Sequence, residues 1–518
     1  MAHALVKMEV SQKQAYIFSS NKLKDNVLNS AVIAWIMSPK YFEQISGESG
    51  LFDPKNNLVY SGGGHIVLEF EEKETAVSFV KLVTFQIHKD YPGIEVFAKV
   101  LEYSEEDRKK AKTMIEKMEE LSKALERKKA SRLSAFRQGS FGIERVDSTT
   151  LKPVLKSVNG IEYKEQKMPK EEQKTDVELS ISDYNLASRF EDLGGSHGES
   201  SFLAVVHIDG NAMGARVSEL YEKAKADKRA KWDKFKDKLK VFSEEIDKDF
   251  KASYKEMLEE VQKNLKSENL KELNLKDKDF PVRRIITAGD DICFVTDGRI
   301  GIECAVTFIN KLTKKKNKQD SKNYSACAGV AIVHQKYPFY QAYELAEKLC
   351  SNAKKFGVSI AGSGVSAIDW HIEFGEIKDS LDEIRSQYQT LDGQHLELRP
   401  YVVEPKNLKK EEKIRQYDSF KKLMEKLKDS EIFTARSKMK EFRSVLKQGN
   451  AAVDAFIKFN KLNEISKNVS EAYYDQKPME IMEQGGLEGK WFDTGKDGIE
   501  RSLIFDALEV ADTYISFK

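Results

Sequence analysis

Apolar and polar positions in the first hundred residues alternate between a strand period and a helix period. Short β-rich runs indicate strands, and apolar residues that recur every three or four positions indicate helices. Two of the β-rich runs flank Gly62, Gly63 and Gly64, which is typical of a hairpin with a glycine turn. The predicted elements are a strand at 4–10, one or two helices within 11–38 that end at Pro39, a hairpin at 58–70, a helix at 75–88 and a strand at 94–101.

The same order begins again near residue 202. The run FLAVVHID is apolar throughout and ends in an acid, which suits a strand that is buried on both faces. The predicted elements are this strand at 202–209, long charged helices at 215–275, a hairpin at 282–297, a helix at 302–312, a strand at 324–334, a helix at 338–356 and a final strand at 365–372. The chain therefore contains one strand–helix–hairpin–helix–strand unit twice, which predicts an internal repeat of a ferredoxin-like domain.

The repeat gives an α+β fold class with two ferredoxin-like domains, a topology that resembles the palm of nucleotide cyclases and polymerases, and a C-terminal helical domain. The expected parts are a first palm at 1–104, a helical and polar linker region at 105–198, a second palm at 199–374 that carries the helical insertion at about 215–275, and a C-terminal helical domain at 375–518.

Charge and cysteine content narrow the class of protein. The 85 Lys and Arg residues balance 84 Asp and Glu residues, which argues against a protein that mainly coats nucleic acid. The four cysteines include no CxxC pair, so neither a zinc knuckle nor a disulfide framework is indicated, and buried free thiols are expected. No signal peptide or membrane segment is recognised, so we expect a soluble, cytoplasmic protein without a membrane partner.

Three acids fall where the topology of the second unit brings them together. Asp209 ends the first strand, and Asp290 and Asp291 lie at the hairpin turn. In a ferredoxin-like sheet the first strand lies beside this hairpin, so the three carboxylates should converge and repel one another unless a cation lies between them. Hard oxygen ligands suit Mg²⁺ or Mn²⁺. An Asp pair at a turn is by itself most often only a turn, but the combination predicts a two-ion catalytic and metal site.

Several neighbours could contact a nucleotide at this site. Gly289 allows a tight turn and the close approach of a triphosphate, and Gly210 opens a loop into a helix whose N–H groups can bind phosphate. Lys354 lies near the end of the helix at 338–356, where it either reaches a triphosphate or remains a solvated lysine at the helix C-terminus. His207 and His334 are interpreted as packed histidines.

The sequence resembles a known family at these motifs. HIDGNAMG at 207–214, AGDD at 288–291 and AYELAEKLCSNAKKFG at 342–357 resemble the second palm of the CRISPR type III large subunit, the Cas-ten family. QAYIFSSNKL at 14–23 and YSGGGHIVLEF at 60–70 resemble its first palm, SAIDWHI at 366–372 resembles the segment that closes the second palm, and LIFDALE at 503–509 resembles part of its C-terminal domain.

The resemblance implies a function. Enzymes of this family polymerise ATP and release cyclic oligoadenylates as second messengers in antiviral defence, and their palm is similar to GGDEF diguanylate cyclases. It implies metal ligation by Asp209, Asp290 and Asp291, phosphate binding by Lys354, ATP as substrate, and effector subunits with guide and target RNA as candidate partners. The alternative is a palm scaffold of an RNA-guided complex with weak or no synthesis. A diguanylate cyclase fits poorly, because AGDD lacks the acid and aromatic pair of GGDEF.

Three departures from the family pattern matter. Ala288 stands where the family usually has Gly, which is tolerable if its φ is negative. We expect no HD nuclease domain, since the chain starts at the first palm, and no zinc module, since no cysteine cluster lies between the palms. These two departures bring DNA cleavage and ordinary complex membership into question.

The first palm carries a different turn. Gly62, Gly63 and Gly64 stand where the second palm has its acids, so no two-ion centre is expected there. Three consecutive glycines are costly in chain entropy. They form either an ordinary glycine hairpin or an open backbone against which an acceptor nucleotide binds, with its 3′-hydroxyl directed at the donor triphosphate on the second palm. Ser11, Gln12 and Gln14, at the start of the first helix, are interpreted as caps.

Overall fold

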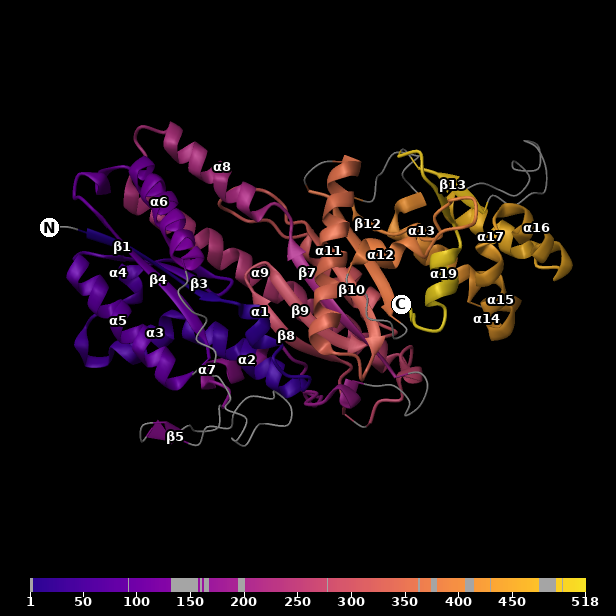
Figure 1. The fold of residues 1–518 in the computed structure, drawn as a ribbon, viewed down its shortest axis with the longest axis horizontal. Helices are drawn as coiled ribbons and strands as arrows, with labels where there is room; N and C mark the ends of the chain where they lie inside the picture. The colour runs from indigo at the N-terminus through magenta and orange to yellow at the C-terminus, as the bar shows by residue number, and fades with distance from the viewer. Residues whose placement is uncertain are drawn as a thin grey trace.

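The computed structural model places two main β-sheets and a helical C-terminal region along one elongated chain (Figure 1). The smaller sheet lies near the N-terminal end, the larger sheet lies in the middle, and the C-terminal helices lie beyond it. The structure describes residues 3–91, 93–131, 157–158, 161–162, 167–193, 201–276, 278–361, 364–373, 380–405, 414–428, 430–474, 491–495 and 497–518.

The first sheet has the strand order β2-β3-β1-β4 and is antiparallel throughout. Its strands are β1 (His3–Ser11), β2 (Leu58–Gly62), β3 (His65–Phe70) and β4 (Glu95–Tyr103). Val6 and Met8 alternate with Leu5 across the pleat, and the two sets belong to different hydrophobic clusters. This order is that of a ferredoxin-like unit and confirms the predicted palm arrangement.

The helices of the first palm follow the predicted order with one difference. They are α1 (Lys13–Ile17), α2 (Leu23–Ile36), α3 (Pro39–Ser46), α4 (Pro54–Asn57) and α5 (Lys73–Asp90). Pro39 ends the preceding helical region, as predicted, but it also begins α3. Ser38 accepts a hydrogen bond from the Tyr41 amide, so Pro39 occupies a first helical position where its missing N–H costs nothing.

The second sheet has six strands in the order β12-β11-β10-β7-β9-β8. They are β7 (Phe202–Gly210), β8 (Val282–Ala288), β9 (Asp291–Asp297), β10 (Ala326–His334), β11 (Ser366–Glu373) and β12 (Tyr401–Glu404). The four strands β10, β7, β9 and β8 repeat the order of the first sheet. β11 lies parallel to β10, and β12 continues the sheet beyond residue 374, so the predicted final strand is not the last one.

Helices cover the second sheet and connect it to the first palm. They are α8 (Met213–Ala226), α9 (Trp232–Lys266), α10 (Gly301–Leu312) and α11 (Phe339–Ala361). The insertion predicted at 215–275 is α8 and α9. At 1.5 Å per residue, the 35 residues of α9 span about 52 Å. The first residues of α9 pack on the first palm, and its later residues pack in the core of the second.

The region between the palms contains α6 (Ala111–Ala130) and α7 (Lys170–Glu178). Within the linker region predicted at 105–198, residues 132–156, 159–160, 163–166 and 194–198 lie outside the described residues. The helix α7 packs near α2 and β8, where its buried Asp176 pairs with Arg283 at 2.6 Å and with Arg284 at 3.1 Å. This part of the linker region is therefore ordered against both palms.

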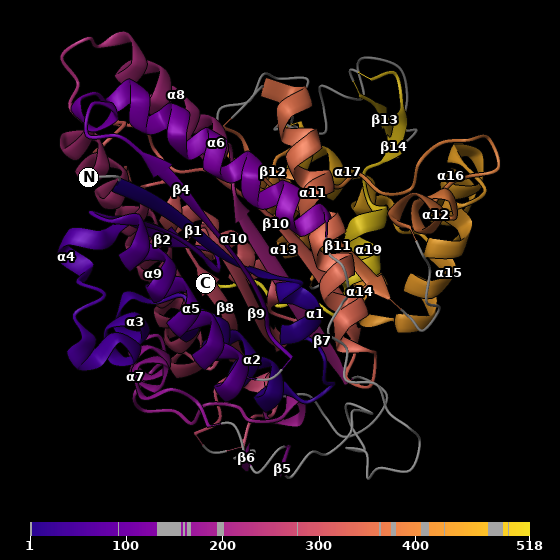
Figure 2. The same cartoon turned by 60° about the vertical axis from the view of Figure 1, so that its left-hand side comes forward.

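The C-terminal region is mainly helical, as predicted, with a small hairpin. Its elements are α12 (Leu381–Ser386), α13 (Tyr417–Leu427), α14 (Glu431–Thr434), α15 (Arg436–Leu446), α16 (Asn450–Phe459), α17 (Asn463–Tyr473), β13 (Phe492–Thr494), β14 (Glu500–Ser502) and α19 (Phe505–Val510). Arg399, which is fully buried, pairs with Asp506 at 2.7 Å and Glu509 at 2.6 Å. These bonds hold the LIFDALE segment close to the second palm sheet (Figure 2).

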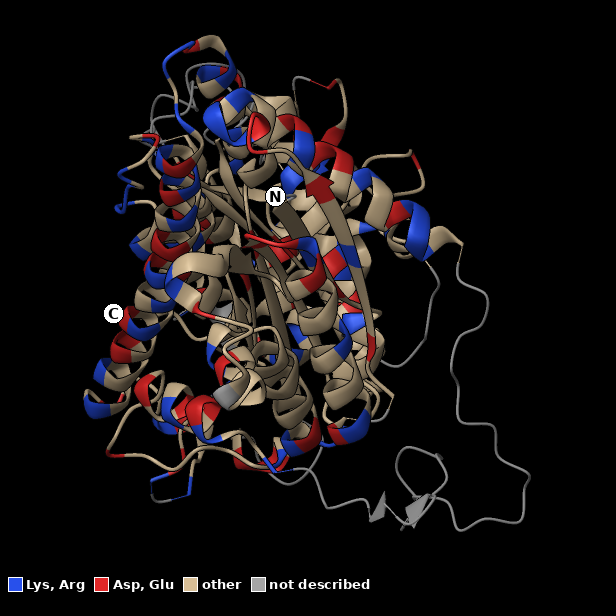
Figure 3. Ribbon diagram, turned by 90° about the vertical axis from the view of Figure 1, so that its left-hand side faces the viewer, with Lys and Arg blue, Asp and Glu red and all other residues tan. Residues whose placement is uncertain are grey.

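Acidic and basic side chains are interspersed over the helices of the first palm, as expected for a chain of net charge +1 (Figure 3). All four cysteines are free and buried, as predicted. Among the described residues, no helix is both long enough and apolar enough to span a bilayer.

Candidate active site

Asp209 and Asp291 face each other as paired residues on the neighbouring strands β7 and β9. The hairpin turn is held beside them, because the Gly210 amide donates to the Asp290 carbonyl at 3.1 Å. The structure thus brings together the three acids that the sequence singled out. The side chains of Asp209 and Asp291 remain 40% and 41% exposed, so a ligand from solvent can reach both carboxylates.

Two glycines make this arrangement possible for different reasons. Gly289 has a φ of +66° at the first central position of the hairpin turn, where a II′ turn requires glycine. At Gly210 the reason is space, since an added Cβ would lie 2.8 Å from the Cβ of Asp290. Ala288 belongs to β8 and has no positive φ, so its methyl group is tolerated, as expected.

Burial and the charge of Asp209 make the carboxyls of Asp290 and Asp291 reluctant to ionise. Burial, followed by the charge of Asp209, raises the pKa of Asp290 from 3.8 to about 6. The same two causes raise the pKa of Asp291 to about 7. This pattern is what the sequence predicted for acids that converge without a cation.

Lys354 supplies the nearest positive charge. Its Nζ lies 2.5 Å from Oδ2 of Asp209 and donates to the Gly210 carbonyl at 3.1 Å. Burial would lower the pKa of Lys354, but the Asp209 carboxylate outweighs it, and the net shift is upward. Because α11 continues to Ala361, Lys354 is not at a helix end, and the interpretation as a solvated helix-end lysine is wrong.

His207 is packed, as predicted, but it lies beside the site. Its ring is 5% exposed and meets Tyr343 edge-on at 5.5 Å. Burial lowers its pKa, and its Nδ1 lies 3.5 Å from Oδ1 of Asp291. Within the described part of the chain, this Oδ1 is buried and accepts no hydrogen bond. His334 is half-buried against Phe202.

The carboxylates of Asp209, Asp290 and Asp291 suit a cation that the substrate also helps to bind. Over the described residues, no three acidic, imidazole or thiol groups lie close enough to enclose a metal ion by themselves. Magnesium, however, is commonly held by one or two carboxylates together with phosphate oxygens and water. The hard carboxylate oxygens, the orphaned oxygen of Asp291 and the repulsion that raises two pKa values suit such an open site.

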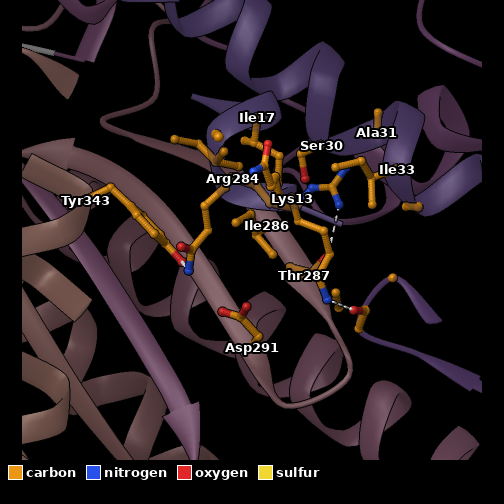
Figure 4. A pocket seen from close by; sticks show the side chains of 18 of the residues that line it. Lys13, Ile17, Ser30, Ala31, Ile33, Arg284, Ile286, Thr287, Asp291 and Tyr343 are labelled. Carbon is orange, nitrogen blue, oxygen red and sulfur yellow. Dashed lines mark hydrogen bonds between the residues drawn. The ribbon is translucent and has the colours of Figure 1, made fainter. Parts of the chain in front are cut away.

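A cavity of about 580 Å³ lies between the two palms and reaches Asp291. Figure 4 shows Asp291 directed toward it from β9, with Lys13 and Arg284 across the space. The Lys13 ammonium donates to the Gly63 carbonyl, and Arg284 donates to Thr287 at 2.8 Å. The cavity thus joins Asp291 and Arg284 of the second palm to Lys13 and the glycine turn of the first.

Several residues around this cavity were not predicted, and one prediction was wrong. Gln12 precedes α1 but makes no side-chain cap, and Gln14 reaches across to Glu347 of α11 at 2.9 Å. Neither side chain therefore caps the helix, although Gln12 occupies the N-cap position. Lys13 and Arg284 lie in segments that were identified, but no periodicity or motif distinguishes a lysine or arginine that points into a space between domains.

The first hairpin differs from the second in its turn. Gly63 and Gly64 have φ of +57° and +73°, the pattern of an I′ turn, which requires positive φ at both central residues. The turn itself therefore accounts for these two glycines without a ligand. Both still line the cavity, whereas Gly62 lies in β2, where an added Cβ would lie 3.6 Å from the Ser243 hydroxyl.

Comparison with known proteins gives the same family as the motifs. Residues 202–358 match the family described as Cas10/Cmr2, second palm domain. No curated protein matches the sequence.

Solved structures match over nearly the whole chain. The Csm1–Csm4 cassette in complex with cA4 has a TM-score of 0.54 and 13% identity, covering 99% of this chain and 70% of that one. Csm1 of T.onnurineus has a TM-score of 0.54 and 13% identity, covering 99% of this chain and 70% of that one. The Csm1–Csm4 subcomplex of the type III-A CRISPR-Csm interference complex has a TM-score of 0.53 and 13% identity, covering 99% of this chain and 69% of that one. Residues 202–358 therefore match the second palm domain of the Cas10/Cmr2 family, and the chain as a whole has the fold of these Csm1 structures.

Proposed function

We propose that the protein is a metal-dependent nucleotidyltransferase that converts ATP into cyclic oligonucleotides of the oligoadenylate type. The observation that carries the proposal is the pairing of Asp209 with Asp291, whose side chain lines a cavity of about 580 Å³ between the palms. A protein that served only as a scaffold would not need converging acids beside such a space. The similarity to a Csm1–Csm4 cassette in complex with cA4 agrees with this class of product.

The carboxylates act by holding cations against a triphosphate. When bound, Mg²⁺ or Mn²⁺ lowers the pKa of a ribose hydroxyl and neutralises charge on the phosphates and the departing pyrophosphate. Asp291 is placed to contact both the cavity and, through its register, Asp209. Asp290 lies at the turn above Gly210, and its raised pKa means that a cation displaces a proton when it binds.

Lys354 has two tasks in this proposal. It holds Asp209 in place through a 2.5 Å ion pair, and its ammonium is available at the edge of the acid cluster for a phosphate oxygen. A charged hydrogen bond of this kind is short and directional, so it fixes the carboxylate before the substrate arrives.

The first palm is proposed to hold the acceptor nucleotide. Lys13 of the first palm and Arg284 on β8 of the second line the same cavity as Asp291, so these two cations can bind the phosphates of a second ATP. Arg284 is oriented for this by Asp176, at 3.1 Å, and by Thr287. An acceptor bound there would present its 3′-hydroxyl to the acids of the second palm.

A second candidate is a weakly catalytic scaffold of an RNA-guided effector complex. Two observations favour it: no complete cation cage is formed by the described residues, and Lys354 already neutralises Asp209. The relatives Csm1–Csm4 are solved as a pair of subunits. We therefore propose a Csm4-like subunit as a partner under either function.

Incubation with labelled ATP and Mg²⁺ or Mn²⁺ separates the two functions. We expect the purified protein, alone or with its partner subunit and a guide–target RNA duplex, to release pyrophosphate and form products that resist phosphatase because their ends are joined. The absence of product under all of these conditions, with both cations, would leave the scaffold as the function.

A further inference from the structure

One helix contacts the hairpins of both palms. The Ser243 hydroxyl of α9 donates to the Ser61 carbonyl at 2.9 Å, one residue before the glycine turn of the first palm. One helical turn later, Oδ1 of Asp247 accepts the Gly289 amide at 3.3 Å, in the turn that carries Asp290. Residues four apart lie on the same helix face, about 6 Å apart along the axis.

The side chain of Asp247 is held in position to accept the hydrogen bond from the Gly289 turn. Its second oxygen, Oδ2, receives the Lys251 ammonium at 2.7 Å from the next turn of α9. This spacing, with the acid N-terminal to the lysine, is the favourable orientation of a helical ion pair. The two oxygens of Asp247 therefore have separate partners, one on its own helix and one on the catalytic hairpin.

The two ends of α9 are fixed in different domains. Near its start, Trp232 and Phe235 are buried with Leu5 and Tyr103 of the first palm, and Lys236 forms a buried 2.6 Å ion pair with Glu69 of β3. Later residues, such as Tyr254 and Met257, lie in the core of the second palm. A helix that is anchored at both ends cannot slide, so its contacts at Ser243 and Asp247 keep a constant separation.

We propose that α9 is a spacer that sets the position of the catalytic hairpin relative to the glycine hairpin, and that Asp247 is a positioning residue that aims the Gly289–Asp290 turn. Asp247 contacts neither substrate nor cation. It acts through the backbone of the turn, so that Asp290 and Asp291 are correctly placed when a triphosphate binds. This role rests on the proposed nucleotidyl transfer.

The test compares Asp247→Ala with Asp247→Asn. The amide oxygen of Asn can still accept the Gly289 N–H, whereas Ala cannot. We expect Asp247→Ala to lower kcat by roughly 10-fold to 100-fold, with KM for ATP within about twofold, because small displacements of reacting groups cost this much. Asp247→Asn should recover most of the rate. Glu244→Ala, an exposed acid on the same helix, is the matched control and should behave as wild type.

Amide hydrogen exchange at residues 288–291 tests the positioning independently of activity. Loss of the acceptor should speed exchange of the Gly289 amide in Asp247→Ala, and not in Asp247→Asn or Glu244→Ala. Wild-type turnover in Asp247→Ala, or unchanged exchange at Gly289, would overturn the inference. A wild-type protein that makes no product would instead defeat the proposed function, and the exchange experiment would still decide whether Asp247 holds the turn.

Discussion

Lys354 and Asp209 form an ion pair of 2.5 Å that joins helix α11 to the end of strand β7. This pair places a cation beside three acids before any metal or nucleotide is bound. Its removal therefore affects both the binding of phosphate and the electrostatics of the cluster, and these two effects can be measured separately.

Lys354→Met should weaken ATP binding and raise the pKa values of Asp290 and Asp291 further, because the ammonium lowers both. We expect KM for ATP to rise at least tenfold and the onset of activity to move to higher pH. Initial rates across a pH series would measure both. Lys355→Met, an exposed neighbour on the same helix, should leave KM and the pH profile unchanged. Equal behaviour of the two variants would mean that Lys354 is only structural.

Replacing Asp290 and Asp291 together with Ala should abolish product formation and leave the fold intact. Magnesium should raise the Tm of the wild type when nucleotide is present, since a ligand that binds only the native state stabilises it. The double variant should lose this increase. Thermal melts with EDTA or with Mg²⁺ and a non-hydrolysable ATP analogue provide the measurement. Synthesis at a normal rate by the double variant would contradict the assignment of the site.

The metal-free protein should lose stability as the pH rises from about 4 toward 7. The pKa values of Asp290 and Asp291 are raised on folding from 3.8 to about 6 and about 7, so the folded state binds more protons than the unfolded state in this range. Stability that depends on their protonation is therefore present at low pH and lost as the pH passes the folded values. In EDTA, the Tm of the wild type should fall over this range relative to that of the Ala double variant. Parallel curves would mean that the acids do not repel one another as described.

Asp209→Asn should lower turnover by several orders of magnitude in Mg²⁺, with partial recovery in Mn²⁺, because one negative ligand is lost from a two-ion site. It should also lower the pKa values of Asp290 and Asp291, since the Asp209 charge raises both. Rates measured in the two metals test the first effect, and the pH profile of the residual activity tests the second. A variant that runs at the wild-type rate would show that Asp209 only anchors Lys354.

The strands, the hairpins and the convergence of the acids could be predicted because each depends on local pattern and on one topological rule. The apolar run of β7, the Gly289 turn and the ferredoxin-like order together place Asp209 opposite Asp291. The cavity could not be predicted in the same way. Lys13 and Gln14 begin α1 of the first palm, whereas Arg284 lies on β8 of the second, and their meeting depends on how the palms dock. The packing of α9 on the first palm could not be predicted for the same reason, since its charged sequence indicates only a solvated helix face.

The last prediction concerns the number of nucleotides that one chain binds. Calorimetry with a non-hydrolysable ATP analogue and Mg²⁺ should give two per chain, one at the acids of the second palm and one near Lys13 in the cavity. Lys13→Gln should remove or weaken the acceptor site, because it takes a cation from the side of the cavity opposite Asp291. Lys24→Gln, an exposed lysine on α2, is the control. Gly63→Val is a poorer test, since a φ of +57° strains the backbone for any residue with a side chain.

The Asp290→Ala, Asp291→Ala double variant should lose the donor site and keep the acceptor site. Lys13→Gln and the double variant should therefore each bind one nucleotide, the first at the acids and the second in the cavity near Lys13. Mixing these two variants should not restore synthesis unless the active site is shared between chains. A wild-type stoichiometry of one that Lys13→Gln leaves unchanged would rule out the acceptor role and leave the first palm as a structural partner of the second.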